Sequence, residues 1–193
     1  MPTKKISTAF PIEQVTVAFA RQTESNVTTN DDHKVLQILN GRGSIGPLLD
    51  YEFVMQDLSQ SETPNLLVTW MSDDSMTAAH GREFHGYSAA SLVDRFPANV
   101  YLNEQNWTSL RKPHHEHWHR EFGPRAMQMY RKYMVAHEVG HVLGLEHTVS
   151  ASDECDLMEQ QTFAPKRKCR PSPRIQTHTA KVLRIKRRTN PLV

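Results

Sequence analysis

The sequence predicts an α/β (α+β) fold, in which a strand and a helix precede several strands, a long helix, an irregular region and a final helix. Two observations predict it. Short runs rich in β-branched and aromatic residues recur between residues 12 and 103, whereas apolar residues at helical spacing continue for several turns only after residue 124. The 193 residues suffice to bury a core, so we expect one domain over residues 1–188 and a short tail at 189–193.

The first half of the chain is predicted to contain five strands and one helix. Apolar residues at helical spacing after the first strand predict a helix that ends at Asn40-Gly41. The fragment at 65–71 is almost continuously apolar, which is typical of a strand buried on both faces. Strands are expected at residues 12–19, 51–55, 65–71, 84–90 and 98–103.

The second half is predicted to contain a long loop and two helices. Residues 104–124 are polar and exceed the usual length of a connection, so we expect a functional or well-anchored surface loop. The long helix follows and ends at Gly144, a residue suited to a helix terminus. After three prolines between residues 165 and 173, the last helix is expected at about residues 174–187. Its inward-facing residues are expected to be Ile175, Val182 and Leu183.

The strongest chemical signal is a motif on the long helix. Residues 137–147 read His-Glu-Val-Gly-His-Val-Leu-Gly-Leu-Glu-His, which is H-E-x-x-H-x-x-G-x-x-H. His137 and His141 are four residues apart, so on a helix both imidazoles can reach one metal at about 2.0–2.1 Å. Gly144 permits a sharp exit from the helix, which returns His147 towards the same point. Three histidines that leave a fourth position for water form the pattern of a catalytic zinc site.

Glu138 is the predicted catalytic residue of this motif. It stands one step round the helix from His137, where it can meet a water at the metal without ligating the metal itself. Zinc lowers the pKa of such a water to about 7, and Glu138 is placed to accept the proton as general base. The residue types therefore predict hydrolytic chemistry with one zinc ion.

These eleven residues resemble the zinc signature of the metzincin peptidases. Metzincins also carry a methionine in a tight turn after the third histidine, and here Asp156-Leu157-Met158 follows His147. The resemblance implies that Met158 lies beneath the metal-binding imidazoles as a packing base and not as a ligand. The alternative is an ordinary core methionine.

The resemblance also implies a metzincin-like zincin fold. Its twisted mixed sheet has an antiparallel edge strand above the cleft, followed by the active-site helix and an irregular lower part that ends in a helix. The upper part would cover about residues 1–144 and the lower part about 145–188. The edge strand would lie near residues 84–90 and bind an extended substrate by strand addition, which makes Gly86, Tyr87 and Ser88 candidate substrate-binding residues.

The metzincin subfamily is left open. Thr148 after His147 does not match the matrixin, astacin, serralysin or adamalysin branches, and no tyrosine follows Met158 as an extra ligand. Cys155 and Cys169 are placed as in the small bacterial snapalysins, which however use aspartate in place of the third histidine. Either a disulfide or two free thiols fits the sequence.

Two further features bear on cofactors and partners. His114-His115-Glu116-His117-Trp118-His119 is a dense histidine cluster, for which a second metal site is the alternative to a solvated loop. Residues 160–193 hold ten basic residues and no Asp or Glu. This basic C-terminal region is either solvated or a contact for an anionic partner such as nucleic acid.

Targeting signals are not evident in this sequence. It has no apolar run of about 18 residues, so we expect no membrane span. The charged start at Met1-Pro2-Thr3-Lys4-Lys5 has no apolar core behind it, so no signal peptide is evident. A secreted mature domain and a cytoplasmic protein both fit, and the oligomeric state is not specified.

The function that these observations predict is that of a zinc-dependent endopeptidase, a metalloendopeptidase that hydrolyses proteins or peptides. One alternative is a protease recruited to nucleic acid by the basic C-terminal region, which salt-dependent DNA binding would favour. The other is a non-enzymatic zinc-binding protein, which the presence of Glu138 disfavours.

Overall fold

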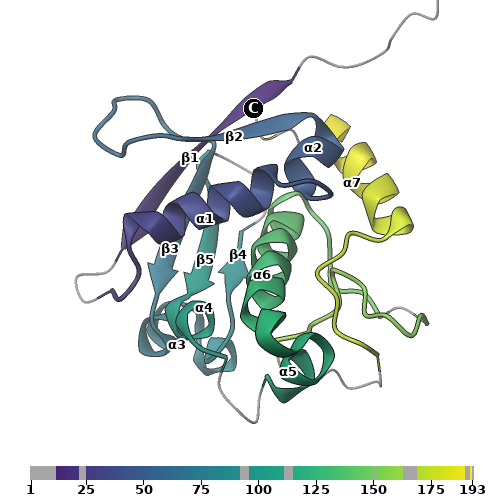
Figure 1. Cartoon of the computed structure of the whole chain (residues 1–193). Coiled ribbons are helices and arrows are strands. Elements are labelled where there is room, and N and C mark those ends of the chain that lie inside the picture. Colours follow the sequence, from purple (N-terminus) through teal and green to yellow (C-terminus); the bar gives the residue numbers. More distant parts are fainter. Residues whose placement is uncertain are drawn as a thin grey trace, which may run out of the picture.

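A five-stranded mixed sheet with helices packed against it forms the centre of the structure (Figure 1). The computed structural model describes residues 12–21, 25–91, 96–110, 115–149, 151–162, 169–189 and 192. The strands are β1 (Glu13–Arg21), β2 (Tyr51–Met55), β3 (Leu66–Met71), β4 (Ala89–Ala90) and β5 (Ala98–Asn103). The helices are α1 (Thr29–Asn40), α2 (Ile45–Leu49), α3 (Asp73–His80), α4 (Glu104–Thr108), α5 (Glu116–Phe122), α6 (Ala126–Val142) and α7 (Thr177–Thr189), with short 3-10 helices η1 (Arg82–Phe84) and η2 (Gly123–Arg125).

The sheet is parallel except at one edge. Its strand order is β2-β1-β3-β5-β4, and only β4 runs antiparallel to its neighbour, β5. Leu66, Val68 and Trp70 of the central strand β3 are fully buried, which agrees with the apolar run in its sequence. The observed class is therefore mixed α/β, consistent with the predicted α+β arrangement.

The helix that carries the motif is fixed by a buried aromatic cluster. Helices α1 and α6 lie on the same face of the sheet and contact each other (Figure 1). Tyr130 and Tyr133 of α6 pack against Trp118 of α5, with ring centroids 5.5 Å apart in both pairs. All three side chains are fully or almost fully buried, so the position of α6 is set by the core and not by the loops around it.

Most of the regular elements are confirmed. The strands expected at 51–55 and 98–103 are present with the predicted bounds, and β1, β3, α1 and α6 differ only at their ends. Within the described ranges, we find no helix whose length and apolar character would let it cross a membrane.

The strand predicted at 84–90 is wrong over most of its length. Phe84 ends η1, and its carbonyl accepts from the Tyr87 N–H at 3.0 Å. Gly86 has a φ of 79°, a left-handed conformation that glycine adopts without steric cost. The chain therefore turns at these residues, and only Ala89–Ala90 pair with β5.

The surface loop predicted at 104–124 is also wrong, because buried tryptophans anchor two short helices there. Trp107 of α4 and Trp118 of α5 are fully buried. Asn103 caps α4, since its side-chain oxygen accepts from the Asn106 N–H at 3.0 Å. The two helices have five and seven residues, too few for a helical period to appear in the sequence.

The last helix starts later than predicted, at Thr177, and Ile175 precedes it. Leu183 is fully buried as expected, and Ile175 is partly buried against the core. Val182 is 39% exposed, so the prediction that it faces inward is wrong. Helices α2 and α3 were not predicted, because each is short and α3 buries only Met76.

Candidate metal centre

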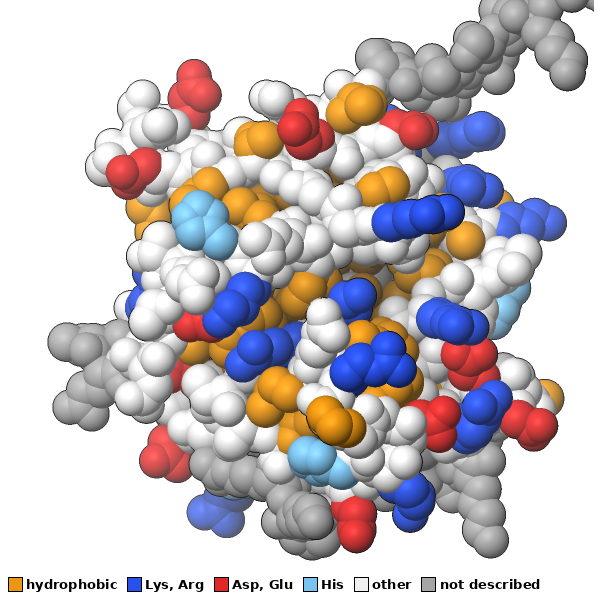
Figure 2. All heavy atoms as spheres, in the orientation of Figure 1, with side chains coloured by type: hydrophobic (Ala, Val, Ile, Leu, Met, Phe, Trp, Pro, Cys, Tyr) orange, Lys and Arg blue, Asp and Glu red, His pale blue; other side chains and the backbone are white. Residues whose placement is uncertain are grey.

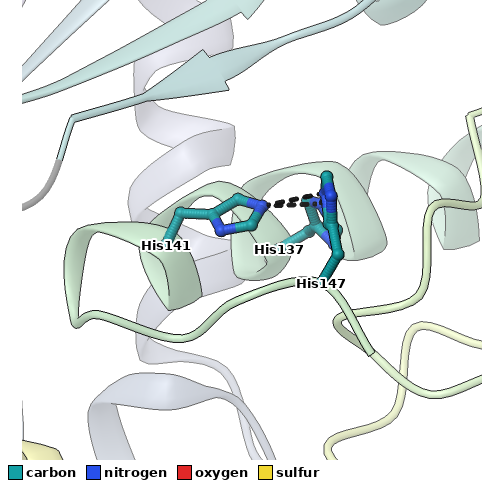
Figure 3. Close-up of side chains that lie close together, drawn as sticks. All are labelled: His137, His141 and His147. Atoms are coloured by element: carbon teal, nitrogen blue, oxygen red, sulfur yellow. Dashed lines mark hydrogen bonds between the residues drawn. The ribbon is translucent and has the colours of Figure 1, made fainter. Parts of the chain in front are cut away.

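Three histidine side chains meet near the carboxyl end of α6 (Figure 3). The Nε2 atom of His141 lies 3.1 Å from Nε2 of His137 and 3.1 Å from Nε2 of His147. The Nε2 atoms of His137 and His147 are 3.2 Å apart. Two of these residues come from α6 and the third from the segment after it, so the fold brings the three predicted ligands to one point.

Backbone carbonyls orient two of the three rings. The Nδ1 atom of His137 lies 2.8 Å from the carbonyl oxygen of Leu157, and Nδ1 of His141 lies 2.8 Å from that of Leu145. A carbonyl oxygen only accepts, so Nδ1 carries the proton in both rings and Nε2 keeps a free lone pair. This is the orientation in which a histidine binds a metal through Nε2.

The triangle of nitrogen atoms fits a single cation of the size of zinc. Tetrahedral coordination at about 2.0–2.1 Å requires ligand nitrogens about 3.3–3.4 Å apart. The observed separations of 3.1–3.2 Å are close to this value. Nitrogen lone pairs that face each other so closely repel, and a cation between them turns the repulsion into attraction. Three imidazoles without a thiolate form a donor set typical of catalytic zinc sites.

Removal from water favours the neutral form of the three rings. It lowers the pKa of His137 to about 3, with the neighbouring His141 adding to the effect. Burial also lowers the pKa of His141 and of His147 below the ordinary value. Because metals bind the neutral imidazole, no proton has to be displaced from these rings near neutral pH.

Gly144 makes the sharp exit from α6 that the motif predicts. Its φ is 82°, which a residue with a Cβ rarely adopts. The Gly144 N–H donates to the His141 carbonyl at 2.8 Å, and the Leu145 N–H donates to the Gly140 carbonyl at 3.0 Å. These bonds close the last turn of the helix and start the segment that carries His147 back.

Met158 packs against α6 between the first two ligands. A Cβ added at Gly140 would lie 2.6 Å from the Met158 sulfur, so the thioether touches the helix backbone directly before His141. Met158 is 1% exposed and belongs to a tight turn in which the Glu159 N–H donates to the Asp156 carbonyl at 3.0 Å. The role of Met158 as a packing base beneath the imidazoles, which the metzincin resemblance implies, stays a prediction.

The buried carboxylate of Asp156 joins the segments around the site. Its Oδ1 accepts from the Met158 N–H at 2.8 Å and from the Thr148 hydroxyl at 3.0 Å. Its Oδ2 accepts from the Thr179 hydroxyl at 2.9 Å and lies 2.8 Å from Nε2 of His178. One carboxylate thus links the residue after the third ligand to the methionine turn and to α7. Sequence reasoning missed this role, and its only signal was the position two residues before the methionine.

The methionine turn is also cross-linked to the segment before α7. Cys155 and Cys169 form a disulfide, so the sequence's alternative of two free thiols does not apply. The Cys155 N–H donates to the Arg170 carbonyl at 2.8 Å. The Gln161 side chain donates to the Ser172 carbonyl at 3.1 Å and accepts from the Ser172 N–H at 2.7 Å. These contacts hold the lower part of the site together where it has no sheet.

Glu138 is buried beside the ligands. It is 6% exposed and lines the same cleft as the three histidines. In the metal-free protein, burial raises the pKa of Glu138 to about 8. A cation bound at the histidines opposes this shift, because it favours the ionised carboxylate. A carboxyl group with these opposing influences is suited to accept and return a proton near neutral pH.

A cleft of about 750 Å³ contains the site and extends to β4. Among the predicted substrate-binding residues, Tyr87 and Ser88 line it, whereas Gly86 does not. The Gly86 carbonyl accepts from the Asn106 side chain at 2.7 Å and is therefore used within the fold. Residues Ala89–Ala90 of the edge strand line the cleft as well.

The charged side chains of this cleft, apart from the histidines, are all acidic. The exposed Glu83 and Glu146 line it together with the buried Glu138. No lysine or arginine is found there among the described residues. Such a cleft disfavours acidic side chains of a bound substrate.

The second histidine cluster does not assemble into a metal site within the described residues. His114 lies outside them. His117 and His119 place their Nε2 atoms against two different carbonyls, those of Gln161 and Leu110, at 2.9 and 3.4 Å. His115 packs against the ring of Tyr130. Their ligand atoms do not converge, and the chain around them is helix α5 and not a solvated loop.

The first prediction concerns the contact between Gly140 and Met158. In Gly140→Ala the new methyl overlaps the sulfur, so we expect a loss of about 1–3 kcal/mol in the free energy of unfolding and weaker zinc binding. The expected loss is a net value, which already includes the gain of about 1 kcal/mol that alanine brings to a helix. Urea unfolding measures the effect, and Met158→Ala supplies the matched background. If Gly140→Ala lowers the free energy of unfolding by the same amount in the Met158→Ala background as in the wild type, the two residues do not interact as described.

The second prediction concerns Asp156. In Asp156→Asn the negative charge is lost, and one of the two oxygens becomes an NH₂ group, which no longer accepts the bonds that this oxygen receives. We expect a loss of about 1–3 kcal/mol of stability and weaker zinc binding, because the segment of the third ligand loses its anchor. Competition with a chelator measures the affinity. The exposed Asp153→Asn is the control and should leave both quantities unchanged. Equal effects of the two substitutions would contradict the assigned role.

The third prediction is a pH dependence of the metal-free protein. The pKa of Glu138 is raised from 4.5 to about 8, so its contribution to stability is complete below pH 4.5 and is lost as the pH rises towards 8. His137 has the opposite effect on stability. Its pKa is lowered from 6.5 to about 3, so its contribution to stability is lost as the pH falls from 6.5 to 3. Between pH 6.5 and 8 the effect of Glu138 therefore dominates over that of His137.

We accordingly expect the free energy of unfolding of the metal-free wild type to fall between pH 6.5 and 8, by at most about 2 kcal/mol. Glu138→Gln, which cannot ionise, should show a flatter profile in urea unfolding with a chelator present. Parallel profiles for the two proteins would show that Glu138 is not held in its protonated form.

Comparisons with known proteins identify the family but not an activity. A search of the curated proteins found no match. The model of one family, described as "Protein of unknown function (DUF3152)", matches residues 37–173, which is more than half of the chain and includes the histidine motif and Met158. The chain therefore belongs to the DUF3152 family.

Proposed function

We propose that this protein is a zinc-dependent endopeptidase of the metzincin type. The observation that carries the proposal is the convergence of three neutral histidine Nε2 atoms, 3.1–3.2 Å apart, in a cleft that also holds the carboxyl group of Glu138. Zinc bound at this point would supply an acidified water and a positive charge that polarises the substrate carbonyl. His137, His141 and His147 would hold the ion.

Glu138 moves the proton in this proposal. Its carboxylate accepts a proton from the attacking water and then donates it to the departing amine. The side chain is fixed by burial next to the first ligand, so it needs little reorganisation during the reaction. Its position next to His137 on α6 keeps it close to the ligands without making it one of them.

The edge strand supports a peptide as the substrate. β4 pairs with β5 along one side only, and within the described sheet its other side has no strand neighbour. Its residues line the cleft that holds the histidines. An extended peptide can add to such an edge through its backbone, which places a peptide bond in the cleft independently of the side chains.

The metzincin type of fold is supported by the order of these parts. An antiparallel edge strand, a helix with the first two ligands, a glycine turn and a methionine turn beneath the helix follow each other in the chain. The alternative of a protease recruited to nucleic acid rests on the ten basic residues of the C-terminal region 160–193. In α7, Arg187 is engaged with Glu13 and Asp50, and residues 166–168 lie outside the described ranges.

The fourth prediction tests the peptidase directly. Wild type and Glu138→Gln should each bind one zinc, and casein should be cleaved by the wild type about 10²–10⁴ times faster, because only the wild type has a general base. Removal of zinc by a chelator should abolish cleavage, and added zinc should restore it.

Glu146→Gln is the matched control, since Glu146 is an exposed glutamate of the same cleft and the same motif. It should keep most of the activity. Zinc binding without cleavage by any of these proteins would favour the non-enzymatic zinc-binding protein. Equal cleavage by wild type and Glu138→Gln would refute the role of this residue.

A further inference from the structure

A second groove lies beside α6, away from the candidate metal centre. It has a volume of about 850 Å³ and runs between α1, the turn after it, α6 and the segment before α7. It shares no lining residue with the cleft of the three histidines. Figure 2 shows this face of the molecule, with lysine and arginine side chains around a hollow in which hydrophobic side chains are visible.

The rim of the groove is positively charged. Among the described residues, no aspartate or glutamate lines it, and the charged residues are Lys34, Arg42, Arg131, Lys132 and Arg174. Two of these are engaged within the fold: Lys34 pairs with a carboxylate oxygen of α1 at 2.9 Å, and Arg131 donates to the carbonyl of Trp107 at 2.9 and 2.7 Å.

Arg42, Lys132 and Arg174 are the remaining cations of the rim. All three are exposed, and none forms an ion pair with a carboxylate of the described residues. They come from three separate segments: the turn after α1, helix α6 and the segment before α7. Positive charge is therefore spread along the length of the groove.

The lining between these cations is apolar. Ile38, Met129 and Ile175 line the groove and are partly buried against the core. Their exposed parts offer aliphatic surface, and methionine adapts its shape to different partners. None of the described residues that line the groove is aromatic, so these residues offer no stacking platform of the kind on which single-stranded nucleic acids bind.

From these features we infer that the groove binds an acidic peptide segment of a protein partner, in which carboxylates alternate with aliphatic side chains. Cations from three segments match charges repeated along an extended chain better than they match one compact anionic group. The aliphatic lining accepts the side chains between the carboxylates. The volume lies within the range of about 300–1,000 Å³ that is usual for ligand sites. The inference does not depend on the proposed peptidase activity.

The test is the binding of a fluorescein-labelled peptide of twelve alternating Glu and Leu residues, measured by fluorescence anisotropy. The full chain is used with Glu138→Gln as background, so that the peptide cannot be consumed. We expect saturable binding that weakens with salt, because exposed charges are screened. A peptide of alternating Glu and Ser, which keeps the charges but lacks the aliphatic groups, should bind at least about tenfold more weakly.

Two triple variants locate the site. Reversal of the groove charges in Arg42→Glu, Lys132→Glu and Arg174→Glu should weaken binding by about tenfold or more. The control reverses three exposed cations of α7, in Lys181→Glu, Arg184→Glu and Arg188→Glu, and should change binding less than about threefold. Thermal unfolding and zinc content verify that both variants fold.

Three outcomes would overturn the inference: no saturable binding of the Glu-Leu peptide, equal weakening by the two triple variants, or tighter binding of a twelve-nucleotide thymidine strand that only the groove variant loses. The last result would assign the groove to nucleic acid.

Discussion

The constraint on which the rest of the structure depends is the close approach of three imidazole Nε2 atoms, of which those of His137 and His141 are unprotonated. At 3.1 Å the lone pairs of these two nitrogens repel unless a cation lies between them, so the fold must hold both rings in place. It does so with two backbone carbonyls, one in the turn directly after α6 and one in the methionine turn. The carbonyl of Leu145 fixes His141 and that of Leu157 fixes His137. Both the turn after α6 and the methionine turn must therefore form before the site exists.

The parts around the site serve this alignment. The core aromatic cluster fixes α6, and the Tyr133 hydroxyl of that helix accepts from the Gln161 N–H at 2.8 Å, which ties α6 to the chain after the methionine turn. Asp156 joins this turn to α7, and the disulfide of Cys155 joins it to the segment before α7. The irregular lower part is thus held by buried polar contacts and one covalent bond, where the upper part is held by a sheet.

The sequence predicts those features that depend on local spacing. The ligands on α6 follow from the i, i+4 spacing of a helix, and the exit at Gly144 follows from its missing Cβ. The strand at 84–90 fails because Gly86 adopts a positive φ that the composition of the segment does not reveal. The helices at Trp107 and Trp118 are missed because each fully buries only one apolar side chain, which gives no period in the sequence. The bond from His137 to the Leu157 carbonyl and the bond from Thr179 to Asp156 join residues far apart in the chain, so only the tertiary fold defines them.

The central claim is that the three histidines form one zinc site with an open position. X-ray absorption at the zinc edge of the zinc-loaded protein tests it most directly. The account predicts one zinc per chain with three imidazole nitrogens and one oxygen at about 2.0–2.1 Å, and no sulfur. A sulfur neighbour at about 2.3 Å, fewer than three imidazoles, or a protein that binds no zinc would contradict it.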